Sequence, residues 1–327
     1  MRTHPSVFVR MLIAAATLAV ACRPQPVAAQ NAELDHAAPA TTSVAAAVLD
    51  LRKLKLPREA EPVSEPRLAS VHYHQQADVK TAFSHVKTQL ISLGCEEIPG
   101  GYETEQYCAT TFQKQQFRIS VMVLPHSQPD QVSVNVSNHG NIDLTALPKP
   151  KDTTLQFSNA AMAMYEVPGS QEKIRQEVMG AMTNQKWLPY GTAGDQMFFR
   201  RNAVVASVNS ITAPAQDNKI LLQYASQLVS AEIPLPPNAS NAHYADVTRE
   251  LSFSTTDDVN AVGKFYQNSL AADGWEPTTE APLAIDFEFV QIFRRRDGQQ
   301  MRLLMKDIKD EGRRDVRMKL WMDKVEQ

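Results

Sequence analysis

The stretch TTDDVNAVGKFYQNSLAADGW, residues 255–275, carries the clearest structural signal in the chain. A threonine at its start can cap a helix, and Asp257 and Asp258 place negative charge at the positive end of the helix dipole. Apolar side chains follow at steps of three and four, which puts them on one helical face. That face consists of Val259, Val262, Tyr266 and Leu270. The pattern predicts an amphipathic helix with one side in a core.

The end of this helix and the element after it are also marked. Gly274 suits a left-handed residue after the last turn, and Trp275 follows as a large anchor. Pro277 stops any continuation of the helix. The segment FEFVQIFRRR, residues 287–296, then alternates in the manner of a strand. We therefore expect the helix to pack across a sheet.

The same order of signals recurs twice upstream, at a period of about 90 residues. Leu-Pro pairs and helix ends keep this period independently of each other. The Leu-Pro pairs begin at Leu56, Leu147 and Leu235, and the helix ends are Gly94-Cys95, Lys186-Trp187 and Gly274-Trp275. The sequence therefore predicts three tandem modules, at residues 54–143, 144–232 and 233–327.

Within each module we predict a strand, a helix and a three-strand antiparallel meander. This is an α+β fold with one helix packed on one sheet and a small core of its own. The helices are expected at 78–93, 170–185 and 256–273. The residues expected to anchor these helices on their sheets are Leu90, Gly94, Met182, Trp187, Tyr266, Leu270, Gly274 and Trp275.

The first 29 residues are typical of an export signal. Arg2 and Arg10 supply positive charge, residues 11–21 are apolar, and small residues precede Gln30. Eleven apolar residues are too few to span a bilayer. Alternatively, Cys22 is a lipidation site. Either way we expect an exported protein of the periplasm or cell envelope.

Residues 30–53 are predicted to form a disordered tether and linker. Their first part is rich in Ala, Thr, Pro and Ser, and it offers too little apolar surface to offset the entropy of the chain.

Cys95 and Cys108 remain as an even pair once Cys22 is removed or lipidated. In an oxidising compartment such a pair favours a disulfide, and Cys95 stands where the other modules have Trp187 and Trp275. The alternative is two buried free thiols, because cysteine also behaves as a small apolar side chain.

His72 and His74 lie two residues apart on the first predicted strand, so both imidazoles point to the same side and could bind one metal ion. Alternation places Val71 and Tyr73 inside and both histidines on a solvated face. No third ligand is evident. These two residues are the weak metal candidates, and no cofactor is expected.

Arginines and lysines are frequent near the C-terminus, including 294–296, Arg302, Arg313, Arg314, Arg317 and Lys319. Acidic residues are interspersed among them, and the whole chain has a formal charge of −3, so nucleic-acid binding has little electrostatic support. A structural role at strand ends is the economical interpretation, with an anion site as the alternative. The sequence also lacks the hydrolase, zinc-protease, phosphate-loop and Cys-x-x-Cys motifs.

The run Phe265-Tyr266-x-x-x-Leu270-x-x-x-Gly274-Trp275 resembles a module of uncharacterised exported bacterial proteins and lipoproteins, often found in tandem. The resemblance implies export and a repeated small fold, and it implies no activity.

The leading hypothesis is a non-enzymatic cell-envelope protein that binds or scaffolds another envelope protein or surface component. It would touch the membrane only through a lipid on Cys22. A small-molecule or glycan-binding protein is the alternative. A metal-dependent hydrolase built on His72 and His74 is the third hypothesis.

Overall fold

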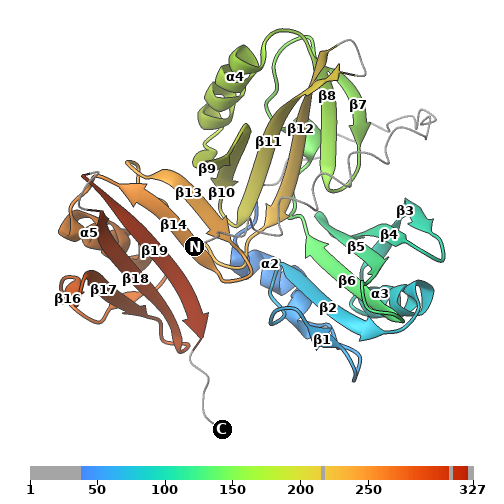
Figure 1. The fold of residues 1–327 in the computed structure, drawn as a ribbon, viewed down its shortest axis with the longest axis horizontal. Coiled ribbons are helices and arrows are strands. Elements are labelled where there is room, and N and C mark those ends of the chain that lie inside the picture. Colours follow the sequence, from blue (N-terminus) through green and yellow to red (C-terminus); the bar gives the residue numbers. More distant parts are fainter. Residues whose placement is uncertain (1–37, 215–217, 309–311, 323–327) are drawn as a thin grey trace. The chain divides into compact units, whose positions relative to one another are not determined.

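The computed structural model describes residues 38–214, 218–308 and 312–322. The signal peptide predicted at 1–29 and the lipidation candidate Cys22 lie outside the described residues. Nineteen strands in three antiparallel sheets and four α-helices make up the described part (Figure 1). None of the helices described is long and apolar enough to span a membrane.

The first sheet has six strands in the order β1-β2-β6-β5-β4-β3. Helix α3, Val79–Ser92, follows β2 and lays its apolar stripe on one face of this sheet. Asp78 caps the helix, since its carboxylate accepts a hydrogen bond from the Thr81 amide at 2.8 Å. The strands are β1 Glu61–Pro62, β2 Ser70–Gln76, β3 Glu96–Glu103, β4 Cys108–Lys114, β5 Phe117–Pro125 and β6 Gln131–Asn138.

The second sheet has six strands in the corresponding order, β7-β8-β12-β11-β10-β9. Helix α4, Gln171–Asn184, follows β8 and is capped by the Ser170 hydroxyl. The strands are β7 Thr154–Ser158, β8 Met162–Val167, β9 Leu188–Ala193, β10 Gln196–Arg201, β11 Val204–Ala213 and β12 Lys219–Leu228.

The third sheet has seven strands, in the order β13-β14-β19-β18-β17-β15 with β16 also paired to β17. Helix α5, Val259–Ala271, follows β14, and its N-cap is Asp258 instead of a threonine. The strands are β13 Ser240–Ala245, β14 Glu250–Thr255, β15 Glu276–Pro277, β16 Leu283–Ile285, β17 Glu288–Arg294, β18 Gln299–Ile308 and β19 Arg313–Met322.

The predicted α+β fold of one helix and four strands per module is wrong, because the described chain is mostly β. The strands that the prediction missed lie at the edges of the sheets, such as β1, β3 and β7. Both faces of β3 and β7 are largely exposed, so their side chains show no alternation between apolar and polar. A pattern-based prediction detects half-buried strands and passes over exposed edges.

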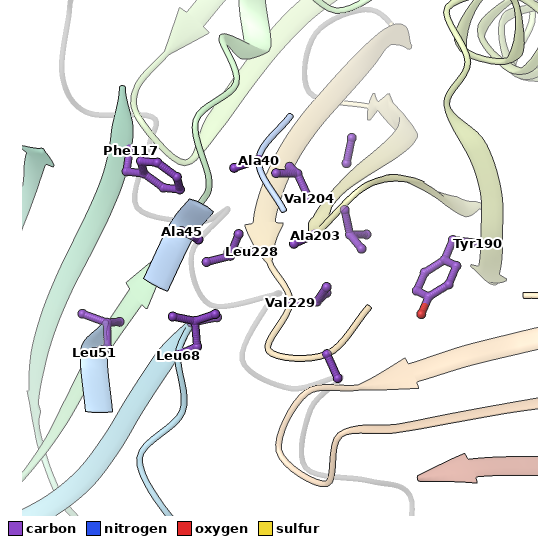
Figure 2. Close-up of a cluster of buried hydrophobic side chains, with 14 of the residues drawn as sticks. Ala40, Ala45, Leu51, Leu68, Phe117, Tyr190, Ala203, Val204, Leu228 and Val229 are labelled. Carbon is purple, nitrogen blue, oxygen red and sulfur yellow. The ribbon is translucent and has the colours of Figure 1, made fainter. Parts of the chain in front are cut away.

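The prediction of a separate core in each module is also wrong. Buried apolar residues form one connected cluster that extends from Ala40 to Leu320 and draws on all three sheets. Figure 2 shows part of this cluster, where Phe117 of the first sheet, Val204 of the second and the segment around Ala45 come together.

The predicted tether at 30–53 is ordered from residue 38 onward. It contains helix α2, Thr42–Val48, and a 3-10 turn η1, Leu51–Lys53. The carbonyl of Ala40 accepts a hydrogen bond from the Ala203 amide at 2.9 Å, and Ala45 and Leu51 are fully buried. Small alanines fit where larger side chains would not, so a composition that suggests disorder here serves close packing.

Candidate functional site

The three sheets each have one face covered by a helix and one face without a helix (Figure 1). In β18, for example, Met301, Leu303 and Met305 are buried, while Arg302 and Lys306 on the opposite face of the strand are exposed. This alternation follows from the period of two along a strand. The face without a helix is called the open face below.

The open face of the third sheet has an apolar side near the β16–β17 hairpin. Because directly paired residues of antiparallel strands share a face, the pairs Leu283 with Val290 and Val290 with Leu304 place these side chains together. Leu283 and Ile285 are 53% and 52% exposed. Phe287, at the hairpin turn, is 86% exposed. An aliphatic patch therefore ends in a projecting aromatic ring.

The other side of this open face is cationic. In β18 and β19, Arg302 lies directly opposite Lys319, and Arg317 lies opposite Leu304. All three cations are exposed. Like charges placed directly opposite each other on a sheet are destabilising. In the residues that the structure describes, none of the three makes an ion pair or a side-chain hydrogen bond.

Arg295 of the predicted arginine cluster has a structural role, as expected for a strand end. Its guanidinium lies 5.1 Å from the centroid of the Trp275 ring and donates to Asp297 at 2.6 Å. Its neighbours Arg294 and Arg296 are exposed. Among the described residues, Arg294 and Arg296 make no ion pair or side-chain hydrogen bond either, so the cations without partners are not confined to β18 and β19.

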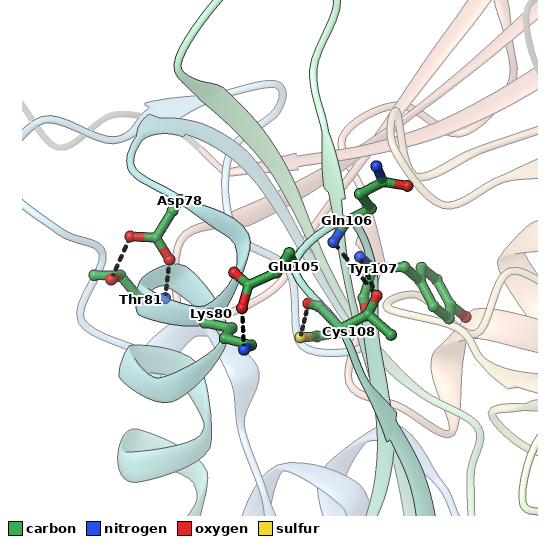
Figure 3. A network of polar contacts seen from close by, with 8 residues as sticks. Asp78, Lys80, Thr81, Glu105, Gln106, Tyr107 and Cys108 are labelled. Carbon is green, nitrogen blue, oxygen red and sulfur yellow. Dashed lines mark hydrogen bonds and ion pairs between the residues drawn. The ribbon is translucent and has the colours of Figure 1, made fainter.

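Two shallow hollows lie elsewhere. One of about 410 Å³ is lined by Gln171, Asp195 and Ser210 among others, and one of about 340 Å³ by Asp78, Glu105 and His126 among others. Three of the four carboxylates that line the hollows have partners, and the fourth, Asp130, makes no ion pair or side-chain hydrogen bond among the described residues. Asp195 pairs with Arg175, Glu105 with Lys80, and Asp78 caps α3, as Figure 3 shows for the last two. These three carboxylates therefore have structural roles, which leaves them less available to bind a ligand.

The metal candidates His72 and His74 lie on the open face of the first sheet. Val71, which precedes them, and Tyr73, which lies between them, are buried as expected. His126, from the loop after β5, joins them, with its ring centroid 4.2 Å from that of His74. Sequence reasoning missed His126 because only the strand pairing brings this loop to β2. Among the described residues, no group of three or more His, Cys, Asp or Glu side chains is arranged to hold a metal ion.

The hydrogen bonds of this histidine cluster are local. The Nε2 atom of His72 lies 3.0 Å from the hydroxyl of Ser133, and the Nδ1 atom of His126 accepts from the Gln128 amide at 3.2 Å. Burial and the neighbouring histidines lower the pKa of His72. Burial, and then His126, lowers the pKa of His74. Protonation of His72 and of His74 is therefore disfavoured relative to a free imidazole.

Cys95 and Cys108 are both buried, and both are free thiols. The disulfide predicted between them is not formed, because the register of the hairpin separates them. Cys108 pairs with Glu103 at one end of β3–β4, whereas Cys95 precedes Glu96 at the other end. Six strand residues correspond to about 20 Å, far beyond the reach of a disulfide. The sulfur of Cys108 instead lies 3.5 Å from the carbonyl of Thr104 (Figure 3).

The predicted anchors lie at the ends of the three helices. Leu90, Met182, Trp187, Tyr266, Leu270 and Trp275 are each at most 4% exposed, and Gly94 and Gly274 have positive φ angles of 82° and 77°. They contribute to the core, where the buried hydroxyl of Tyr266 has no hydrogen-bond partner among the described residues.

One family model, described as START domain-like, matches residues 238–310. This segment begins just before β13 and ends after β18, so it contains α5 and the apolar side of the open face. No curated protein matches the chain. No solved structure matches it.

Proposed function

We propose that the chain is a non-enzymatic binding protein of the cell envelope, and that it binds its partners through the open faces of its sheets. The observation that carries this proposal is the open face of the third sheet, where exposed aliphatic side chains adjoin cations without partners. Exposed apolar groups beside unpaired charge are typical of interaction sites.

The hollows support binding better than catalysis. A general acid or base, or an activated nucleophile, needs a positioned partner within hydrogen-bond reach. Three of the four carboxylates that line the two hollows are engaged by Arg175, Lys80 and the α3 N-terminus. The cysteines are buried, and burial raises the pKa of both thiols, which disfavours the nucleophilic thiolate. Export remains an expectation from the N-terminal sequence.

Photocrosslinking in the native host tests the proposal. A photoreactive amino acid is placed on each open face, at Thr111 in β4, Asn209 in β11 and Ser252 in β14. Matched controls lie on the outer sides of the three helices, at Ser84, Gln176 and Lys264, all of which are exposed. We expect adducts from open-face positions only.

Adducts only from the helix positions would contradict the proposal, and so would the absence of adducts at all six positions. Cell fractionation of the same strains locates the protein. Recovery of the protein in the cytoplasm alone would reject the envelope part of the proposal. The part that concerns the binding faces would still be decided by the crosslinking result.

A further inference from the structure

We propose that the open face of the third sheet docks on the surface of a lipid bilayer that contains anionic phospholipid. This inference rests on the proposed function, since it names the partner of one of the binding faces. It requires an apolar group that can enter the bilayer and cations that can meet lipid phosphates on the same face of the protein.

The apolar group is the β16–β17 hairpin. Leu283 and Ile285 both pair with β17 residues of the open face, and Phe287 projects from the turn between the two strands. The positive φ of Asp286, 53°, belongs to a tight turn, which holds Phe287 at the tip. Aromatic and aliphatic side chains on a protruding element can partition into the interfacial region of a bilayer.

The cationic group lies on the adjacent strands. Arg302 and Lys319 face each other directly, and Arg317, two residues before Lys319 in β19, is the diagonal neighbour of Arg302, so the Cβ atoms of the three lie within about 8 Å of one another. Lys306 lies one row further along β18 on the same face. A negatively charged lipid phosphate would relieve the repulsion between Arg302 and Lys319. Juxtamembrane cations are attracted by anionic lipid in this way.

Acidic residues on the same face limit the affinity. Glu250 lies opposite Lys319, Asp315 opposite Lys306, and Glu288 opposite Ile285. Asp286 lies beside Phe287 at the turn. The charge of the face is therefore mixed, and we expect weak, reversible binding that falls as salt is raised.

A purely polar anionic polymer fits the face less well. Such a polymer would use the cations of β18 and β19 and would gain nothing from Leu283, Ile285 or Phe287. A bilayer provides anionic headgroups and an apolar phase a few ångströms apart, which matches the two sides of this face.

Vesicle co-sedimentation of the full chain tests the inference. The vesicles contain phosphatidylcholine alone, or phosphatidylcholine mixed with phosphatidylglycerol. We expect binding to the mixed vesicles. The double variant Arg302→Gln/Lys319→Gln should bind them roughly 30-fold more weakly, since each cation contributes about 1 kcal/mol near an anionic surface. Phe287→Ser should reduce binding about tenfold, because the ring no longer leaves water.

Matched controls separate this face from the rest of the chain. Lys264→Gln removes an exposed cation on the opposite side of the same sheet, and Leu188→Ser removes a side chain that is 60% exposed in the second sheet. Both should bind like the unmodified chain. Circular dichroism confirms that the variants are folded.

Several results would overturn the inference: no binding to mixed vesicles, equal loss in the Lys264→Gln control, or binding unaffected by Phe287→Ser. If only the double cation variant lost vesicle binding, and the unmodified chain also bound soluble dextran sulfate, the face would be a site for an anionic polymer instead. Photocrosslinks from Thr111 or Asn209 would persist in either case, so the failure of lipid docking is distinguishable from the failure of the proposed function.

Discussion

The backbone amide of Trp275 donates a hydrogen bond to the carbonyl oxygen of Leu270 at 3.3 Å, five residues earlier in the chain. The amide of Gly274 donates to Ala271 at 3.0 Å. Together the two bonds form a Schellman motif, which satisfies carbonyls that a helix end leaves free. The same pair of bonds closes α3 at Gly94-Cys95 and α4 at Lys186-Trp187.

The motif needs a residue with positive φ, and α4 provides it with a lysine. Lys186 has a φ of 64°, where Gly94 and Gly274 stand in the other two helices. A residue with a side chain is strained in this conformation by about 1 kcal/mol relative to glycine. We therefore expect Lys186→Gly to raise the free energy of unfolding by about 0.5 to 1 kcal/mol in urea titrations.

The neighbouring residue Gln185 supplies the control. Its φ of −87° is ordinary for any residue, so Gln185→Gly should lower stability through added freedom of the unfolded chain. Stabilisation by both variants, or by neither, would show that the strain at Lys186 is not the cause.

Trp275 is, with Trp187, the largest of the helix-end anchors. It is 4% exposed and lies under the guanidinium of Arg295. Trp275→Ala removes buried area and leaves a cavity, so we expect a loss of about 3 to 5 kcal/mol in the free energy of unfolding. Phe287→Ala, which removes a ring that is 86% exposed, should change the free energy of unfolding by less than about 0.5 kcal/mol. Equal effects of the two variants would place Trp275 outside the core.

The helix ends could be predicted from sequence because their determinants are local. A left-handed residue, a large anchor and an apolar stripe all lie within one helical turn or two of each other. The face of His72 and His74 followed in the same way from strand alternation. These features require no knowledge of which strands pair.

The remaining features depend on contacts between segments that are distant in sequence. His126 reaches His74 only through the pairing of β5, β6 and β2. The opposition of Arg302 and Lys319 is set by the β18–β19 register. Pairing likewise sets Cys95 and Cys108 at opposite ends of one hairpin. Sequence spacing alone gives no register, so it could predict neither the cationic side of the open face nor the free thiols.

His139 makes the stability depend on pH. Its Nδ1 atom lies 2.8 Å from the carbonyl of Ser226 in β12, and its Nε2 atom lies 2.8 Å from the hydroxyl of Ser120 in β5. Burial lowers the pKa of His139 below its ordinary value of 6.5. The unfolded chain therefore binds a proton before the folded chain does. Stability should be full above pH 6.5 and should fall as the pH drops below it.

Unfolding in urea at several pH values measures this dependence. His139→Gln removes the titrating ring, so it should flatten the decline below pH 6.5. His72 and His74, whose pKa values are also lowered, should retain part of the slope. His243→Gln, at an exposed ring, should leave the slope unchanged. A slope equal in the His139→Gln variant and the unmodified chain would exclude this residue as its source.

The two thiols give the sharpest check of the hairpin register. With Cys95 and Cys108 buried, free and at opposite ends of β3–β4, a maleimide should label neither in the folded protein and both after denaturation without reductant. Burial also raises the pKa of each thiol, which slows the reaction further. Intact mass spectrometry counts the labels. A denatured chain that carries no label on Cys95 or Cys108 and is two hydrogens lighter would mean a disulfide, and so a different pairing of β3 with β4.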